Sequence, residues 1–442
     1  MVQATLSRQR EKRGLIVALY ITIFIILSVL YVKYISPYWQ YHGYRIDIDA
    51  AKIFVGCFLV VCFALAVPSR TNARSFYLHF LLLTLFLPAM VLFSVGGESI
   101  RSASIFVMAM SIVFVASALP IQRFVMLSLS HRMLILFLLI ASIFLTISYI
   151  YFDGTRSFNL NFEEVYDFRR EAASTPAIFS YLSSIFSKSV ITFGMALALH
   201  QRRYYTCAIF FFLSVLIFGF TSHKGVIFYP VLVLLCYVFL TRWIRYRYLL
   251  LAFIGALLVS FGDLALQSFT NNGLAGWYNS LFLRRSLMVP AFLDYRYIEY
   301  FSENAHYFWS TSRFGLGLVA SPYELPPARH MGLVLFGSAD SSANTGFVGS
   351  GFAQAGLIGV ATYALGVGLL IAIVQAYARR WGAAVVVAAT IGPMSSMTAT
   401  DFPTLFLTHG VLVMLLLLAI TRRPETGSSW QRTVVLPAHG AK

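Results

Sequence analysis

Long apolar stretches alternate with short polar stretches over almost the whole chain. Apolar runs of about 20 residues are long enough for a helix to cross a bilayer, and their repetition is typical of multi-pass membrane proteins. The pattern predicts an all-α polytopic fold with about twelve transmembrane helices. They are expected at residues 14–36, 51–68, 76–94, 102–120, 133–152, 176–200, 204–221, 225–240, 249–266, 352–378, 384–400 and 404–420.

Basic residues predict the orientation of these helices. Arg and Lys gather in every second connection, as at Arg379 and Arg380, and the acidic residues on that side are Glu11 and Glu425. The positive-inside rule places such connections in the cytoplasm. Both termini are therefore expected to be cytoplasmic, with a single membrane domain over 1–442, a cytoplasmic tail at 421–442 and a signal anchor as the first helix.

Composition supports the membrane class and excludes several others. The chain is 59% hydrophobic and only 11% charged, whereas soluble domains carry about 25% charged residues. The net charge of +16 follows from the cytoplasmic connections, so no nucleic-acid partner is expected. The cysteines lie in apolar runs and form no disulfide or metal pattern. P-loop, HExxH, GxSxG and Rossmann signatures are absent, so the predicted chemistry uses no metal and no cofactor.

The long polar segment at 267–351 stands between the ninth and tenth predicted helices and is expected as an outer loop. It combines arginines with many Tyr and Trp residues. Arginine binds phosphate through two parallel N–H groups, and flat aromatic faces suit sugar rings. The loop could therefore hold a lipid-linked, phosphorylated sugar. In the alternative interpretation it folds into a small cap, in which the arginines pair with Asp294, Glu299, Glu303, Glu324 and Asp340.

Other charged residues allow two interpretations each. Arg169 and Arg170, in the outer loop at 153–175, form either a diphosphate clamp or local ion pairs. Lys224, in the turn before the eighth helix, either binds an anion or reaches the outer headgroups. Lys188 and Asp263 lie within predicted helices, where charges are costly. They are expected either to pair with each other or to act directly, and His409 is expected to be a hydrogen-bonded core residue.

A transfer to a sugar hydroxyl needs a proton acceptor close to that hydroxyl. The candidates in the long segment are Glu303, His306, His330 and Asp340. Arg329 is expected to lower the pKa of its neighbour His330 and so keep the imidazole neutral. Each of these residues could equally have a structural role, and the sequence does not rank them.

Four stretches together resemble the bacterial oligosaccharide repeat-unit polymerases, the Wzy-type O-antigen polymerase family. They are VYDFRRE, TSHKG, LRRSLMVPAFLDYRYIEYFSENAHYF and SANTGFVGSGFAQAGLIGV. In the turn before the eighth helix the family often has an arginine, where this chain has Lys224. The resemblance implies a GT-C-type glycosyltransferase of the bacterial inner membrane. Such enzymes polymerise undecaprenyl-diphosphate-linked oligosaccharides into O-antigen, capsule or exopolysaccharide on the periplasmic face.

The resemblance also implies roles by position. Arg169, Arg170, Lys224 and Arg285 would contact the diphosphate, and Arg284 is a weaker candidate because adjacent side chains rarely face one site. Asn344 would position substrate, and Tyr300 and Arg313 are expected to bind the glycan. The expected partners are the lipid-linked oligosaccharide and membrane lipids, with a chain-length regulator and a flippase as further candidates.

Three other functions fit parts of the pattern. An O-antigen ligase, which transfers polymer to lipid A core, has the same plan. A lipid-linked oligosaccharide flippase or other transporter fits the helix number, but transporters usually show repeated halves and charge near the membrane midplane. A purely structural membrane protein is disfavoured by the chemistry of the long segment.

Overall fold

The computed structural model describes residues 13–124, 126, 128–153, 158–160, 177–221, 223, 225–243, 245–269, 276–312 and 315–422. Within these ranges all regular secondary structure is helical, apart from two isolated β-bridges. This confirms the predicted all-α class. Eight helices of the described part are long and apolar enough to cross a membrane: Arg13–His42, Ala73–Val95, His131–Phe152, Ile178–His200, Tyr204–Thr221, Gly225–Trp243, Tyr246–Phe269 and Phe347–Trp381.

Four shorter apolar helices, Ala50–Ala66, Ile100–Ala116, Ala383–Thr398 and Val411–Ile420, complete the set. Each predicted apolar segment thus contains a helix, which supports a multi-pass membrane protein. The last segment differs from its prediction because it is divided into α19 (Phe402–Leu407) and α20 (Val411–Ile420). Gly410 between them has a φ of 81°, a left-handed conformation that favours glycine.

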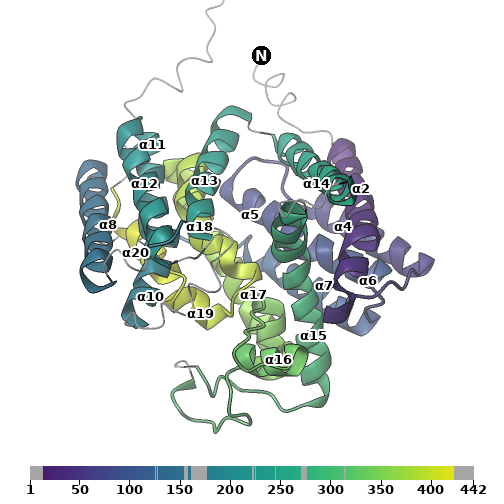
Figure 1. The fold of residues 1–442 in the computed structure, drawn as a ribbon. Coiled ribbons are helices and arrows are strands. Elements are labelled where there is room, and N and C mark those ends of the chain that lie inside the picture. Colours follow the sequence, from purple (N-terminus) through teal and green to yellow (C-terminus); the bar gives the residue numbers. More distant parts are fainter. Residues whose placement is uncertain are drawn as a thin grey trace, which may run out of the picture.

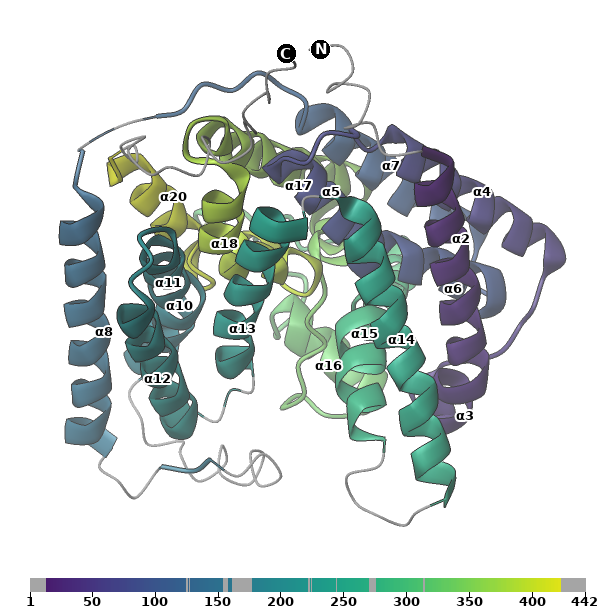
Figure 2. The ribbon, with the colours of Figure 1, turned by 90° about the horizontal axis from the view of Figure 1, so that it is seen from above.

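The helices form two groups on either side of α17 (Phe347–Trp381) (Figures 1 and 2). One group contains α2 (Arg13–Leu30), α4 (Ala50–Ala66), α6 (Leu87–Val95), α7 (Ile100–Ala116) and α14 (Tyr246–Phe269). The other contains α8 (His131–Asp153), α10 (Ala177–Ile185), α11 (Ile191–His200), α12 (Tyr204–Thr221), α13 (Gly225–Val238), α18 (Ala383–Met394) and α20. Because α17 packs against both α7 and α18, it joins the two groups.

The segment expected as an outer loop begins with a buried helix. A π-helical stretch, η7 (Asn279–Met288), continues directly into α15 (Val289–Glu303), which packs against α17, α7 and α6. The buried apolar residues recur every three or four positions, which is the spacing of one helical face: Leu283, Leu287, Ala291, Tyr295 and Ile298. The sequence analysis named no helix in this half, because the charged residues between these positions interrupt the hydrophobic run.

The helix α17 is interrupted near its start. Ala355 and Gly356 have non-helical backbone angles, and the φ of Gly356 is 57°. A Cβ added to Gly351 would lie 2.8 Å from the carbonyl oxygen of Gly359, although eight residues of straight helix span about 12 Å. The chain therefore bends sharply, and the glycines allow the two parts to touch. At the break, the N–H groups of Tyr307 and Phe308 donate to the carbonyl groups of Ala353 and Gln354, at 3.0 and 2.8 Å.

Candidate functional site

The predicted site residues are distributed over separate parts of the molecule. Arg169, Arg170, Lys224 and Arg313 lie outside the described residues. Arg284 and Arg285 lie on η7, whereas Tyr300 and Glu303 lie near the end of α15. The remaining candidates are on or after α16 (Pro327–Phe336): His330, Asp340 and Asn344.

Two of these groups are far apart along one continuous helix. Arg284 and Tyr300 are separated by sixteen residues of η7 and α15, which corresponds to roughly 20 Å at the rise of a helix. The structure therefore does not bring Arg284 and the end of α15 into one small site. Any substrate that reaches both must be extended.

Arg284 lies in an aromatic setting that we call the Arg284 cradle, formed by Arg284, Trp39 and Tyr44. Its guanidinium group stacks on the ring of Trp39, 3.6 Å from the ring centroid. Trp39 ends α3 (Ser36–Trp39), at the end of the first long helix. Gly43, with a φ of 95°, then reverses the chain. Tyr44 can thereby stack on Phe292 of α15, with ring centroids 4.1 Å apart.

The cradle contains buried polar atoms that lack partners. Nε of Arg284, Nε1 of Trp39 and the hydroxyl of Tyr44 are buried without a hydrogen bond to any described residue. Leaving such groups unpaired is costly, so an acceptor that fits between them would be bound favourably. Burial, followed by the charge of Arg285, lowers the pKa of Arg284, yet arginine stays protonated in proteins. A phosphate oxygen is a suitable acceptor for this set of donors.

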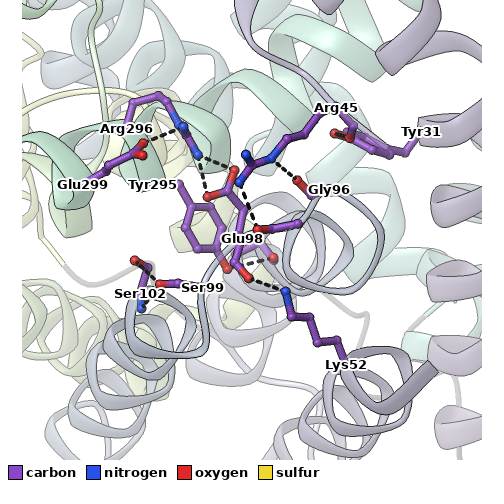
Figure 3. A network of polar contacts seen from close by, with 12 residues as sticks. Tyr31, Arg45, Lys52, Gly96, Glu98, Ser99, Ser102, Tyr295, Arg296 and Glu299 are labelled. Carbon is purple, nitrogen blue, oxygen red and sulfur yellow. Dashed lines mark hydrogen bonds and ion pairs between the residues drawn. The ribbon is translucent and has the colours of Figure 1, made fainter. Parts of the chain in front are cut away.

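Arg296, twelve residues further along the same helix, is in the opposite situation (Figure 3). Its guanidinium group pairs with Glu98 at 2.5 Å and with Glu299 at 2.5 Å. Arg45 donates to the carbonyl groups of Gly96 and Gly97, and Lys52 donates to that of Glu98 at 3.1 Å. We call Glu98, Arg296, Glu299, Arg45 and Lys52 the Glu98 network. Burial raises the pKa of Glu98, and Arg296 opposes this shift.

The Glu98 network has a structural role. It fastens α15 to the turn between α6 and α7 and to the start of α4. Nε of Arg296 is buried without a hydrogen bond to a described residue, as Nε of Arg284 is, but the other guanidinium nitrogens of Arg296 meet two carboxylates, so its charge is already neutralised. The alternative interpretation of the sequence, in which arginines pair with acids of the same segment, therefore holds for Arg296 and Glu299.

His330 forms an aromatic cluster with three tyrosines, Tyr300, Tyr307 and Tyr323, which we call the His330 cluster. Its Nε2 lies 2.9 Å from the hydroxyl of Tyr300, and its ring centroid lies 4.2 Å from that of Tyr323. The pKa of His330 is lowered, but the cause is burial rather than the expected charge of Arg329. In the tautomer in which Nε2 donates to the Tyr300 hydroxyl, Nδ1 is unprotonated, has no partner among the described residues and can accept a proton.

Three other predicted residues are exposed and have few hydrogen-bond partners. Glu303, Asp340 and Asn344 are exposed. Asp340 makes a backbone hydrogen bond to the hydroxyl of Ser338, and no hydrogen bond between described residues joins Glu303 or Asp340 to His330. Of the base candidates on regular elements, His330 is thus the one held by neighbouring side chains.

Lys188 and Asp263 do not pair with each other, in contrast to one expectation. Asp263 accepts hydrogen bonds from the N–H groups of Gly276 and Asn279, at 3.0 and 2.9 Å, and so caps the start of η7. Lys188 instead contacts His409 and the hydroxyl of Ser396. Each charged side chain contacts polar groups other than the expected partner, and the positions of charges along the sequence do not reveal these contacts.

Sequence reasoning also missed Trp39 and Tyr44. The signal was the aromatic-rich stretch YWQYHGY at 38–44, directly after the first apolar run. Within the described ranges, no group of three or more His, Cys, Asp and Glu side chains is arranged to hold a metal ion.

Comparison with known proteins adds no relative: no protein-family model, no curated protein and no solved structure matches this chain.

Proposed function

We propose that this protein is a membrane glycosyltransferase that polymerises undecaprenyl-diphosphate-linked oligosaccharides into surface polysaccharide. The observation that carries the proposal is the Arg284 cradle. A stacked guanidinium and two neighbouring donors, all without acceptors among the described residues, lie at the end of a helix long enough to span a membrane. A phosphate headgroup of a carrier lipid supplies acceptor oxygens at that position.

The proposed topology is that of the sequence prediction. The eight long helices and the four shorter ones would together make twelve crossings of a GT-C-like fold in the bacterial inner membrane. Both termini would be cytoplasmic, and the cradle and the His330 cluster would both face the periplasm. This arrangement supplies the lipid tail from the bilayer and the glycan from the aqueous side.

The separation of the two sites suits a polymerase that extends the non-reducing end of the incoming unit. The diphosphate of that unit would lie in the Arg284 cradle, and its terminal hydroxyl would reach the His330 cluster. One sugar cannot bridge roughly 20 Å, but an oligosaccharide can. This geometry favours Arg284 over Arg285 as the principal phosphate contact, the reverse of the order expected from the sequence.

The proposed reaction needs one proton acceptor. The acceptor hydroxyl attacks C1 of the growing glycan, a C–O bond to that sugar forms, and the bond from C1 to the diphosphate breaks. The proton of the hydroxyl moves to Nδ1 of His330, and the electron pair leaves with the diphosphate of the donor lipid. The tyrosine rings of the His330 cluster would orient the sugars.

The test uses purified protein in liposomes supplied with an undecaprenyl-diphosphate-linked oligosaccharide. Wild type should make a ladder of polymers, and Arg284→Gln should leave single units. Arg101→Gln, which removes an exposed arginine of α7, is the matched control and should keep the ladder. A normal ladder in Arg284→Gln would contradict the proposed site. Product that forms only after lipid A core is added would identify a ligase instead.

A further inference from the structure

A second cationic cluster lies inside the other group of helices, with no role in the proposed site so far. We call it the Lys188 cluster: Lys188, His409, Ser396 and Tyr229. Lys188 is only 8% exposed. Its Nζ donates to the hydroxyl of Ser396 at 3.0 Å, contacts Nδ1 of His409 and lies 5.6 Å from the ring centroid of Tyr229. The hydroxyl and the imidazole take two of the three N–H groups of a protonated lysine, and the ring of Tyr229 adds a cation–π contact.

The backbone is irregular at three members of this cluster. Lys188 lies in a π-helical turn, η5 (Phe186–Val190), and Ser396 lies in a 3₁₀ turn, η9 (Ser395–Thr398). His409 lies in the interruption between α19 and α20. Single π-helical turns inside membrane helices are frequent at functional sites, and interrupted membrane helices are tolerated where they line a cavity or are buried in protein.

Lys188 faces Nδ1 of His409. In the tautomer that accepts from a protonated Lys188, the imidazole is neutral and carries its proton on Nε2. That nitrogen lies 3.4 Å from Oγ1 of Thr400. His409 and Thr400 are both half-buried and Ala399 is exposed, so this edge is the open side of the cluster. Among the described residues, no carboxylate lies within ion-pair distance of Lys188.

We infer that the Lys188 cluster is a second diphosphate site, which binds the carrier lipid of the growing glycan. The N–H of His409 and the hydroxyl of Thr400 would contact the phosphate, and the buried charge of Lys188 would stabilise it. This inference rests on the proposed function. A polymerase handles two carrier lipids at once, and the Arg284 cradle accounts for one of them.

The position of the cluster agrees with this assignment. It lies in the group of helices on the far side of α17 from the Arg284 cradle (Figure 2). A chain of contacts leads from it towards the His330 cluster. Trp309, two residues after Tyr307, donates to the hydroxyl of Tyr363 at 2.9 Å, and that hydroxyl donates to Asp401 at 3.3 Å, next to Thr400. The donor diphosphate would thus lie on the side of the bundle from which the reacting sugar must come.

The test counts bound lipids by native mass spectrometry, with geranylgeranyl diphosphate as the probe. Wild type should bind two per chain, and Arg284→Gln and Lys188→Gln should each bind one. The affinity of the altered site should fall by roughly tenfold to a hundredfold. Lys33→Gln is the matched control, because Lys33 is an exposed lysine in another π-helical turn of a long helix, η1 (Tyr31–Ile35), and should bind two. Competition with pyrophosphate and with geranylgeraniol separates headgroup binding from tail binding.

The outcomes distinguish the inference from the function on which it rests. A wild type that binds one lipid, lost in Arg284→Gln, overturns the second site and leaves the proposed function intact. A wild type that binds none overturns both. Two lipids on Lys188→Gln also overturn the inference. If Lys188→Gln binds none because it misfolds, His409→Gln replaces it, since this variant leaves the lysine in place. It should bind one lipid per chain, and that lipid, retained at Arg284, shows that the variant is folded.

Discussion

Arg284 and Arg296 are two arginines of one continuous helix, formed by η7 and α15, yet they differ in whether acidic side chains lie beside them. Arg296 is 16% exposed and meets two carboxylates. Arg284 is stacked on Trp39, and the described residues supply no acceptor for its N–H groups. A buried cation with matched acids contributes to stability and is already neutralised. A half-buried cation without them, such as Arg284, is held at a cost and is available to a ligand.

The difference also separates two structural roles within one segment. In the Glu98 network the side chains serve the attachment of α15 to the rest of the bundle. In the Arg284 cradle the polar atoms of Trp39 and Tyr44 contribute nothing to folding that the structure shows. Substitutions in the network should therefore change stability first, and substitutions in the cradle should change activity first.

The largest expected effect comes from Arg284. Arg284→Lys keeps the charge but loses the planar fork and much of the stacking on Trp39. We expect polymerisation at limiting substrate to fall by roughly tenfold to a hundredfold, because the incoming carrier lipid binds more weakly. The thermal midpoint of unfolding in detergent should stay close to that of wild type. The measurements are initial rates in liposomes and a thermal scan, and an active Arg284→Lys would show that only the charge matters.

The next effect is on stability and comes from Glu98. Glu98→Gln leaves Arg296 with a single, exposed partner, and losing one member of a buried pair typically costs about 3 kcal/mol. The free energy of unfolding should fall accordingly. Glu299→Gln is the control, because Glu299 is 66% exposed and surface pairs contribute about 0–1 kcal/mol. If the double variant Glu98→Gln/Arg296→Met recovers much of the loss, the cost came from the unpaired charge.

The sequence predicted more of the fold than of the candidate site. The apolar runs predicted the positions of the helices, because run length alone decides whether a helix can span a membrane. The buried helix at Asn279–Glu303 was missed because Arg284, Asp294 and Arg296 lower the average hydropathy of a segment whose buried residues, apart from Asn279 and Asp294, are apolar or aromatic. A search for spacings of three and four residues would have found it.

The site was less predictable because it depends on contacts between distant segments. Arg284 was a candidate, but nothing in the sequence pairs it with Trp39, which lies more than two hundred residues earlier. The same limit applies to Lys188, whose partners on η9 and before α20 became visible only in the folded chain. The pattern of charges predicts on which side of the membrane a residue lies, but it does not predict which side chain the residue contacts.

A pH profile tests whether the His330 cluster belongs to the same reaction as the cradle. Burial lowers the pKa of His330 below its ordinary value of 6.5. A base that loses its proton more readily stays neutral to lower pH, so the acid limb of the rate profile should lie below pH 6.5. Below that limb the rate should drop about tenfold per pH unit. The unfolded chain takes up this proton first, so stability should also fall slightly as the pH decreases through 6.5.

His330→Gln should lose this acid limb together with most of the activity. The control is His200→Gln, because His200 ends α11 in the other group of helices and its ring contacts that of His131. It should retain the limb at the same pH. An acid limb that persists in His330→Gln would assign the proton acceptor to another group, with Glu303 and Asp340 as the next candidates.

The smallest and sharpest test compares two tyrosines that touch each other. Tyr31 and Tyr44 have ring centroids 6.2 Å apart, and both hydroxyls are buried. The hydroxyl of Tyr31 donates to the carbonyl of Arg45 at 2.7 Å, whereas that of Tyr44 has no partner among the described residues. Tyr31→Phe should therefore reduce stability by about 1 kcal/mol, and Tyr44→Phe should leave it unchanged or raise it. Affinity for the probe lipid should show the opposite order. Tyr44→Phe should weaken binding and Tyr31→Phe should leave it unchanged, because only Tyr44 can donate to a bound phosphate. A stability loss in Tyr44→Phe equal to that in Tyr31→Phe would mean that the Tyr44 hydroxyl has a partner in the unliganded protein, and the cradle would then be no more available to a ligand than the Glu98 network.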